Sequence, residues 1–96
     1  MNNAIHPSHY GTTLDLFEQL ELTWNTPQLI GAYKFNIIKY LTRHERKNGL
    51  EDIKKAQVYL DRLKGVAELR QINQSGFIVQ AQEIIDRERA KYEVQI

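Results

Sequence analysis

The sequence contains no cysteine among its 96 residues, which limits the chemistry open to it. Disulfides and thiolate metal ligands are excluded, and a reducing cytoplasm is the expected compartment. Serine occurs only as Ser8 and Ser75, which leaves little material for a nucleophilic triad. The chain also lacks a Gly-x-x-x-x-Gly-Lys-Ser/Thr phosphate loop and a Gly-x-Gly-x-x-Gly fingerprint. The ordinary phosphate-loop and dinucleotide-binding folds are therefore excluded.

A strong net charge and long apolar runs are absent as well. Thirteen Lys and Arg nearly balance twelve Asp and Glu, for a net charge of +1. Nucleic acid is therefore not an expected partner, since binding would need a local basic patch. No stretch approaches the roughly 18 apolar residues of a membrane span, and the N-terminus does not resemble a signal peptide. These features predict one soluble, cytoplasmic domain over residues 1–96 with no membrane partner.

What is present is helical periodicity, and the sequence predicts an all-α protein. Residues 1–11 form an irregular arm, and Thr12 or Thr13 would cap a short N-terminal helix. Thr26-Pro27 is typical of a second helix start. The main pair of helices is expected at about 27–47 and 50–72, separated by the turn at Asn48-Gly49. A C-terminal helix is expected at about 76–95.

The short turn predicts that the two central helices pack antiparallel with their apolar arcs facing each other. A polar arc lies beside the apolar arc on each helix, so the two polar arcs could flank one groove. Polar arcs beside a core are common in amphipathic helices, but the arc on helix 27–47 has three cations and no acid. The arcs consist of Asn36, Lys39, Arg43 and Lys47 on the first helix, and Asp52, Lys55, Tyr59 and Arg62 on the second.

The C-terminal helix carries one apolar stripe, made of Ile78, Ala81, Ile85 and Tyr92. The stripe could pack on helix 50–72 of the same chain or on another subunit. A homo-oligomer is the favoured interpretation, because one thin bundle of this size would leave apolar surface uncovered.

The three histidines offer a weaker signal. His6 and His9 could contribute to a metal site, but the spacing supplies no third ligand, so no metal site is predicted. These two residues would equally serve to fasten the arm to the body. His44 falls close to the apolar arc and is interpreted as a packing residue.

Several motifs occur in an order that resembles a known family. They are His6-Pro-Ser-His-Tyr-Gly, Asn36-Ile-Ile-Lys-Tyr-Leu-x-Arg43, Lys47-x-Gly-Leu-Glu-Asp-Ile-x-Lys-Ala56 and Tyr59-Leu-x-Arg62-Leu. The combination resembles a family of small bacteriophage proteins, usually filed as a domain of unknown function. This family includes the nucleotide kinase from the early region of a lytic coliphage. The resemblance covers about residues 6–64, so the family-like core is taken as 12–64 and residues 65–96 as a helical extension.

The resemblance implies a phage-encoded protein that handles nucleotides in the host cell, with a deoxynucleoside monophosphate kinase as the specific activity. Phosphoryl transfer of this kind uses cations around the phosphate and usually Mg²⁺ as cofactor. The catalytic candidates are Arg43, Asp52 and Glu18. The nucleotide-binding candidates are His6, His9, Tyr10, Asn36, Lys39, Arg43, Lys47, Lys55, Tyr59 and Arg62.

One departure from the family keeps two alternatives open. Many relatives carry an acidic residue where Thr12 or Thr13 stands here. If that acid is needed for transfer, this protein would bind or sequester a nucleotide or nucleotide-derived molecule without turning it over. A separate alternative, which does not depend on this departure, is a small inhibitor that binds a host protein through its charged helix faces.

Overall fold

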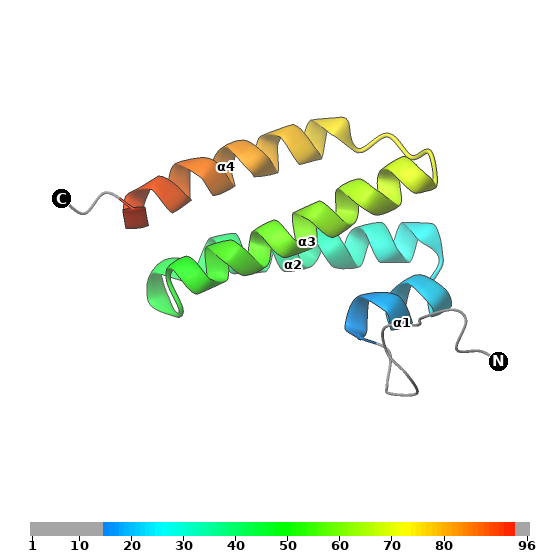
Figure 1. Cartoon of the computed structure of the whole chain (residues 1–96), viewed down its shortest axis with the longest axis horizontal. Coiled ribbons are helices and arrows are strands. Elements are labelled where there is room, and N and C mark those ends of the chain that lie inside the picture. Colours follow the sequence, from blue (N-terminus) through cyan, green and yellow to red (C-terminus); the bar gives the residue numbers. More distant parts are fainter. Residues whose placement is uncertain (1–14, 94–96) are drawn as a thin grey trace.

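In the computed structural model, residues 15–93 are described, and they form helices with no strand among them. The order is α1 (Leu16–Thr23), α2 (Thr26–Arg43), the short 3₁₀ turn η3 (His44–Arg46), α3 (Leu50–Leu69) and α4 (Ser75–Glu93). The helices α2 and α3 lie antiparallel, α4 runs along one side of the pair, and α1 lies near the beginning of α2 (Figure 1). The predicted all-α class is confirmed.

The first two helices begin with reciprocal capping boxes. The side chain of Asp15 accepts a hydrogen bond from the backbone N–H of Glu18 at 2.8 Å, and Glu18 accepts one from the N–H of Asp15 at 3.1 Å. Asn25 and Gln28 repeat the arrangement at the start of α2. The prediction that Thr12 or Thr13 caps the first helix was wrong, because its N-cap is Asp15. Thr26-Pro27 does begin the second helix, with Asn25 as the N-cap. Asp15 and Asn25 each form a capping box with the residue three positions later, and each box satisfies two backbone N–H donors.

The predicted end of the second helix at residue 47 was also wrong, because α2 ends at Arg43 and tightens into η3. The carbonyl of His44 accepts the N–H of Gly49 at 2.8 Å, which closes the helix end and leaves residues 47–49 as the turn. Gly49 has the positive φ expected of it, 54°, but it serves as the N-cap of α3.

The third helix ends at Leu69 and not at residue 72. The stop is made by Gln71, which has a φ of 59°, and by a hydrogen bond from the N–H of Ile72 to the carbonyl of Ala67 at 2.8 Å. Helices commonly end with such a left-handed residue, but it is usually Gly or Asn. Glutamine gives no such signal in the sequence, so the early stop was missed.

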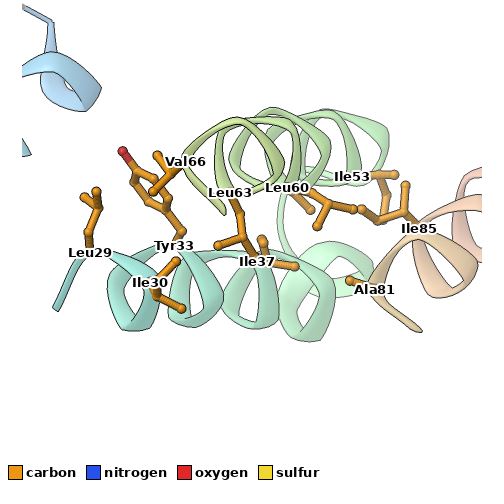
Figure 2. Close-up of a cluster of buried hydrophobic side chains, with 11 residues drawn as sticks. Leu29, Ile30, Tyr33, Ile37, Ile53, Leu60, Leu63, Val66, Ala81 and Ile85 are labelled. Carbon is orange, nitrogen blue, oxygen red and sulfur yellow. The ribbon is translucent and has the colours of Figure 1, made fainter. Parts of the chain in front are cut away.

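The core lies between α2 and α3 and is completed by α4. Figure 2 shows Ala81 and Ile85 from α4 meeting side chains of the central pair, and Ile53 and Ile85 are both fully buried. Ile78 and Tyr92 pack partly buried against the same cluster. The stripe on the fourth helix therefore packs on its own chain, which was the alternative to the favoured homo-oligomer. The buried hydrophobic residues are Leu29, Ile30, Tyr33, Ile37, Ile53, Ala56, Leu60, Leu63, Val66, Ala67, Ala81 and Ile85.

The homo-oligomer stays a prediction. The apolar stripe on α4 does not support it, because the stripe packs on its own chain. In residues 15–93, no helix is both long enough and apolar enough to traverse a bilayer.

Two glycines of the central pair should respond to alanine in opposite directions. Gly49→Ala should lower the free energy of unfolding by about 1–3 kcal/mol, because its φ is positive. In addition, the new Cβ would lie 3.3 Å from Cε1 of Tyr92. Gly65→Ala should raise the free energy of unfolding by about 0.5–1 kcal/mol, since Gly65 is exposed within α3 and nothing lies within 4 Å of its Cβ position. Urea denaturation measures both. A Gly49→Ala protein as stable as the parent would contradict the turn geometry described above.

Candidate functional site

Three cationic side chains from two helices surround the ring of Tyr40. From α2, Lys39 places Nζ 4.6 Å from the ring centroid and Arg43 places Cζ 4.9 Å from it. From α3, Lys55 places Nζ at 5.7 Å. Within residues 15–93, neither lysine has a carboxylate oxygen within 4.0 Å. We call Lys39, Arg43 and Lys55 around Tyr40 the cationic cluster; it carries more positive charge than its one acidic neighbour balances.

That acidic neighbour is Asp52, in the first turn of α3. It is fully buried, and both of its oxygens accept hydrogen bonds from Arg43: Oδ2 from Nε at 3.1 Å and Oδ1 from Nη2 at 3.2 Å. The backbone N–H of Asn48 donates to Oδ2 at 3.3 Å. The hydrogen bonds from Arg43 hold the pKa of Asp52 below its usual value. Asp52 therefore fastens the turn between α2 and α3 and fixes the guanidinium of Arg43 beside Tyr40.

Next to the cationic cluster, aromatic rings form a continuous row that we call the aromatic strip. Tyr40 lies 6.0 Å from Tyr59 between ring centroids, and Tyr59 lies 5.0 Å from Phe17 of α1 in an edge-to-face contact. The ring centroid of Tyr59 also lies 6.0 Å from that of Tyr33. Burial of the Tyr59 side chain raises the pKa of Tyr59. The strip consists of Tyr40, Tyr59 and Phe17, and it joins the cationic cluster to α1.

The aromatic strip ends at a second polar group. The guanidinium of Arg62 lies over the ring of Phe17, at 5.0 Å, and its Nε donates to Oε2 of Glu21 at 2.9 Å. The hydroxyl of Tyr33 donates to the same oxygen at 2.7 Å. Burial first, and then this carboxylate, raise the pKa of Tyr33. A pocket of about 300 Å³ opens beside the group, between α1 and α3, and is lined by Glu21, Asp61, Arg62, Gly65, Val66 and Leu69.

The predicted site residues divide into those on this face and those elsewhere. Four of them gather around the aromatic strip: Lys39, Arg43, Lys55 and Tyr59. Arg62 lies at its far end, and Asp52 lies beneath Arg43. Three others, His6, His9 and Tyr10, fall outside the described residues.

Three predicted residues have other surroundings. The side chain of Asn36 donates to the carbonyl of Ala32 at 2.9 Å within its own helix. Lys47 is exposed in the turn, because α2 ends at Arg43 and the helical spacing does not reach it. Glu18 lies in the capping box of α1, so the structure joins only two of the three catalytic candidates, Arg43 and Asp52.

Sequence reasoning missed three residues of the site. Tyr40 was quoted only as part of a motif, although its position between the polar and apolar arcs and beside Lys39 was a usable signal. Phe17 and Glu21 gave none, because their contacts with α3 span long stretches of chain. Glu21 and Arg62, for example, are 41 residues apart.

His44 belongs to a separate buried cluster that joins η3 to α4. Its Nδ1 lies 2.6 Å from the hydroxyl of Tyr92 and its Nε2 lies 3.1 Å from Oε1 of Glu88, which confirms its prediction as a packing residue. His44, Glu45 and Glu88 offer ligand atoms within 4.8 Å of one another. However, Nζ of Lys91 lies 3.0 Å from Glu88 and 3.9 Å from Glu45, where it already supplies a positive charge to both carboxylates. The cluster thus fits a structural fastening better than a metal site.

Replacing Asp52 should destabilise the fold in a pH-dependent way. Asp52→Asn removes the charge that pairs with Arg43, so the Tm at pH 7 should fall. The folded pKa is depressed, so the stabilisation is present in full above about pH 4 and is lost as the pH falls through the lower folded pKa. The Tm difference between parent and variant should therefore shrink below about pH 4. Glu51→Gln, an exposed acid of the same helix turn, is the control and should show a smaller effect. A Tm difference that is constant from pH 7 to pH 2 would contradict this account.

Comparison with known proteins identifies the family of this sequence. Residues 5–61 match the DUF3310 family, described as proteins of unknown function. The match includes α1, α2 and the start of α3 with Lys55 and Tyr59, and it ends just before Arg62. No curated protein and no solved structure matches the chain. Because the match extends over more than half of the sequence, the chain belongs to the DUF3310 family.

Proposed function

We propose that this protein binds nucleotides, with their phosphates held by the cationic cluster. The observation that carries the proposal is the convergence of Lys39, Arg43 and Lys55 on one aromatic ring from two helices. Phosphate oxygens are strong acceptors for ammonium and guanidinium donors. The resemblance to phage proteins that include a nucleotide kinase points to the same ligand class.

The electrostatics of the cluster support an anionic ligand. Three positive charges lie within 6 Å of one ring centroid, and among residues 15–93 Asp52 is the one carboxylate paired with them. Cation–π contacts hold such side chains in place, but they leave the mutual repulsion of the cations uncompensated. A bound phosphate would relieve that repulsion, so binding should stabilise the folded state and should weaken as salt is added.

Binding without transfer is the form of the proposal that the geometry favours. Phosphoryl transfer needs a group that positions the acceptor and, usually, Mg²⁺. Of the residues assigned to catalysis by resemblance, Asp52 has no exposed surface, and both of its oxygens already accept hydrogen bonds. A nucleotide or metal could reach it only if Arg43 moved away. The role proposed is therefore sequestration of a nucleotide or a nucleotide-derived molecule.

Thermal unfolding with nucleoside mono-, di- and triphosphates, each with and without Mg²⁺, tests the proposal. A ligand at 100 times its Kd should stabilise the protein by about 2.7 kcal/mol, which is a shift of several degrees for a domain of this size. Lys55→Gln should lower the affinity for the best ligand about tenfold or more, because it removes a charged donor to the phosphate. Lys54→Gln is the matched control, since Lys54 is the exposed residue immediately before Lys55 on α3 and its side chain leaves the helix about 100° away.

The outcomes separate the alternatives. A shift that is lost in Lys55→Gln and kept in Lys54→Gln supports a phosphate site at the cationic cluster. Formation of product in a coupled assay with the same nucleotide would favour the kinase over sequestration. No shift with any nucleotide, in a folded sample, would remove the proposal and leave inhibition of a host protein as the next candidate.

A further inference from the structure

The site has two ends with different chemistry, and the proposed function accounts for only one of them. The cationic cluster lies at one end of the aromatic strip. At the other end, Glu21 and Arg62 line a pocket of about 300 Å³, whose wall also includes the apolar residues Val66 and Leu69. A pocket of this size is at the small end of the range for ligand sites, and a small planar group would suffice to occupy it. Two acidic side chains in its lining, Glu21 and Asp61, make the pocket unsuited to phosphate.

The carboxylate of Glu21 is fixed in position by its neighbours. Its Oε2 accepts hydrogen bonds from the Tyr33 hydroxyl at 2.7 Å and from Nε of Arg62 at 2.9 Å. Its Oε1 has one long contact among residues 15–93, with Nη2 of Arg62 at 3.5 Å. Oε1 therefore keeps acceptor capacity beside the donors of Arg62. A nucleotide base presents a matching arrangement, because an N–H donor stands next to an acceptor on its pairing edge.

The separation of the two ends suits one molecule that bridges them. Lys55 and Arg62 are seven residues apart on α3, which corresponds to about 10 Å along the helix axis. An extended nucleoside 5′-phosphate has a span of that order between its phosphate and the far edge of its base. Between the two ends, the ligand would lie along the aromatic strip, whose consecutive ring centroids are 5.0–6.0 Å apart.

We propose that the pocket between α1 and α3 receives the base of the nucleotide and that Glu21 determines its recognition, accepting an N–H of the base on Oε1 while Arg62 donates to the neighbouring acceptor. The proposal rests on the proposed nucleotide binding. It assigns Glu21, which the sequence did not indicate, to the base, and the cationic cluster to the phosphate. It also gives α1 a function, since α1 supplies both Phe17 and Glu21.

Isothermal titration of the full chain with two ligands separates the ends: a nucleoside 5′-monophosphate that binds the parent, and ribose 5-phosphate, which lacks the base. The parent should bind the nucleotide about tenfold or more tightly than the sugar phosphate, as expected for a hydrogen bond to a charged acceptor. Glu21→Gln should lower the affinity for the nucleotide alone, which brings the two affinities close together. Lys55→Gln should lower the affinity for both ligands. Glu68→Gln, an exposed acid of α3 outside the pocket lining, is the control and should leave both affinities near the parent values.

A second variant guards against loss of the fold in Glu21→Gln. Gly65 lines the same pocket, and nothing lies within 4 Å of its Cβ position, so Gly65→Phe adds a ring at the pocket and leaves the Glu21 residue itself unchanged. Gly65→Phe should lower the affinity for the nucleotide and leave the affinity for ribose 5-phosphate unchanged. Equal affinities of the parent for nucleotide and sugar phosphate would overturn the base pocket while leaving the phosphate site intact. Nucleotide binding that is unaffected by Glu21→Gln and Gly65→Phe but weakened by Lys55→Gln would overturn it in the same way. Absence of any binding would remove both proposals.

Discussion

The pairing of Arg43 with buried Asp52 is the interaction on which the candidate site depends. It joins the last residue of α2 to the first turn of α3, and through Asn48 it also holds the turn between them. A buried carboxylate is costly unless it is paired and hydrogen-bonded, and Asp52 meets both conditions. The same bidentate contact orients the guanidinium that borders Tyr40. The cationic cluster is thus built on a structural requirement of the helical hairpin.

Other contacts fix the two ends of this face. On the far side of the hairpin, α4 packs Ile85 into the core and anchors His44 through Glu88 and Tyr92, so the turn is held from both directions. At the opposite end of the hairpin, Arg70 donates to the side chain of Thr26 and to the carbonyl of Glu21, which ties α1 to the central pair. Glu21 therefore belongs to a braced element, and this allows a rigid contact with a ligand.

The sequence predicted most of the fold because the relevant signals are local. Apolar periodicity identified the central helices, and helical geometry predicted two polar arcs of four residues each beside the core. Four of those eight residues, Lys39, Arg43, Lys55 and Tyr59, lie around the aromatic strip. The errors lie at the helix ends, where the deciding contact was either reciprocal, as in the Asp15 box, or used an unusual residue, as at Gln71. The roles of Phe17 and Glu21 could not be predicted, since they follow from the way α1 docks against α3. No pattern within the short helix α1 specifies that contact.

The central claim is that phosphate binds at the cationic cluster around Tyr40, and an NMR titration of the uniformly ¹⁵N-labelled chain with a nucleoside 5′-monophosphate tests it most directly. The largest amide shift changes should fall in residues 39–43 of α2 and 55–62 of α3, and around Glu21 of α1, with little change along the outer face of α4. Shift changes concentrated on α4, or a spectrum that does not respond to the nucleotide at all, would contradict it.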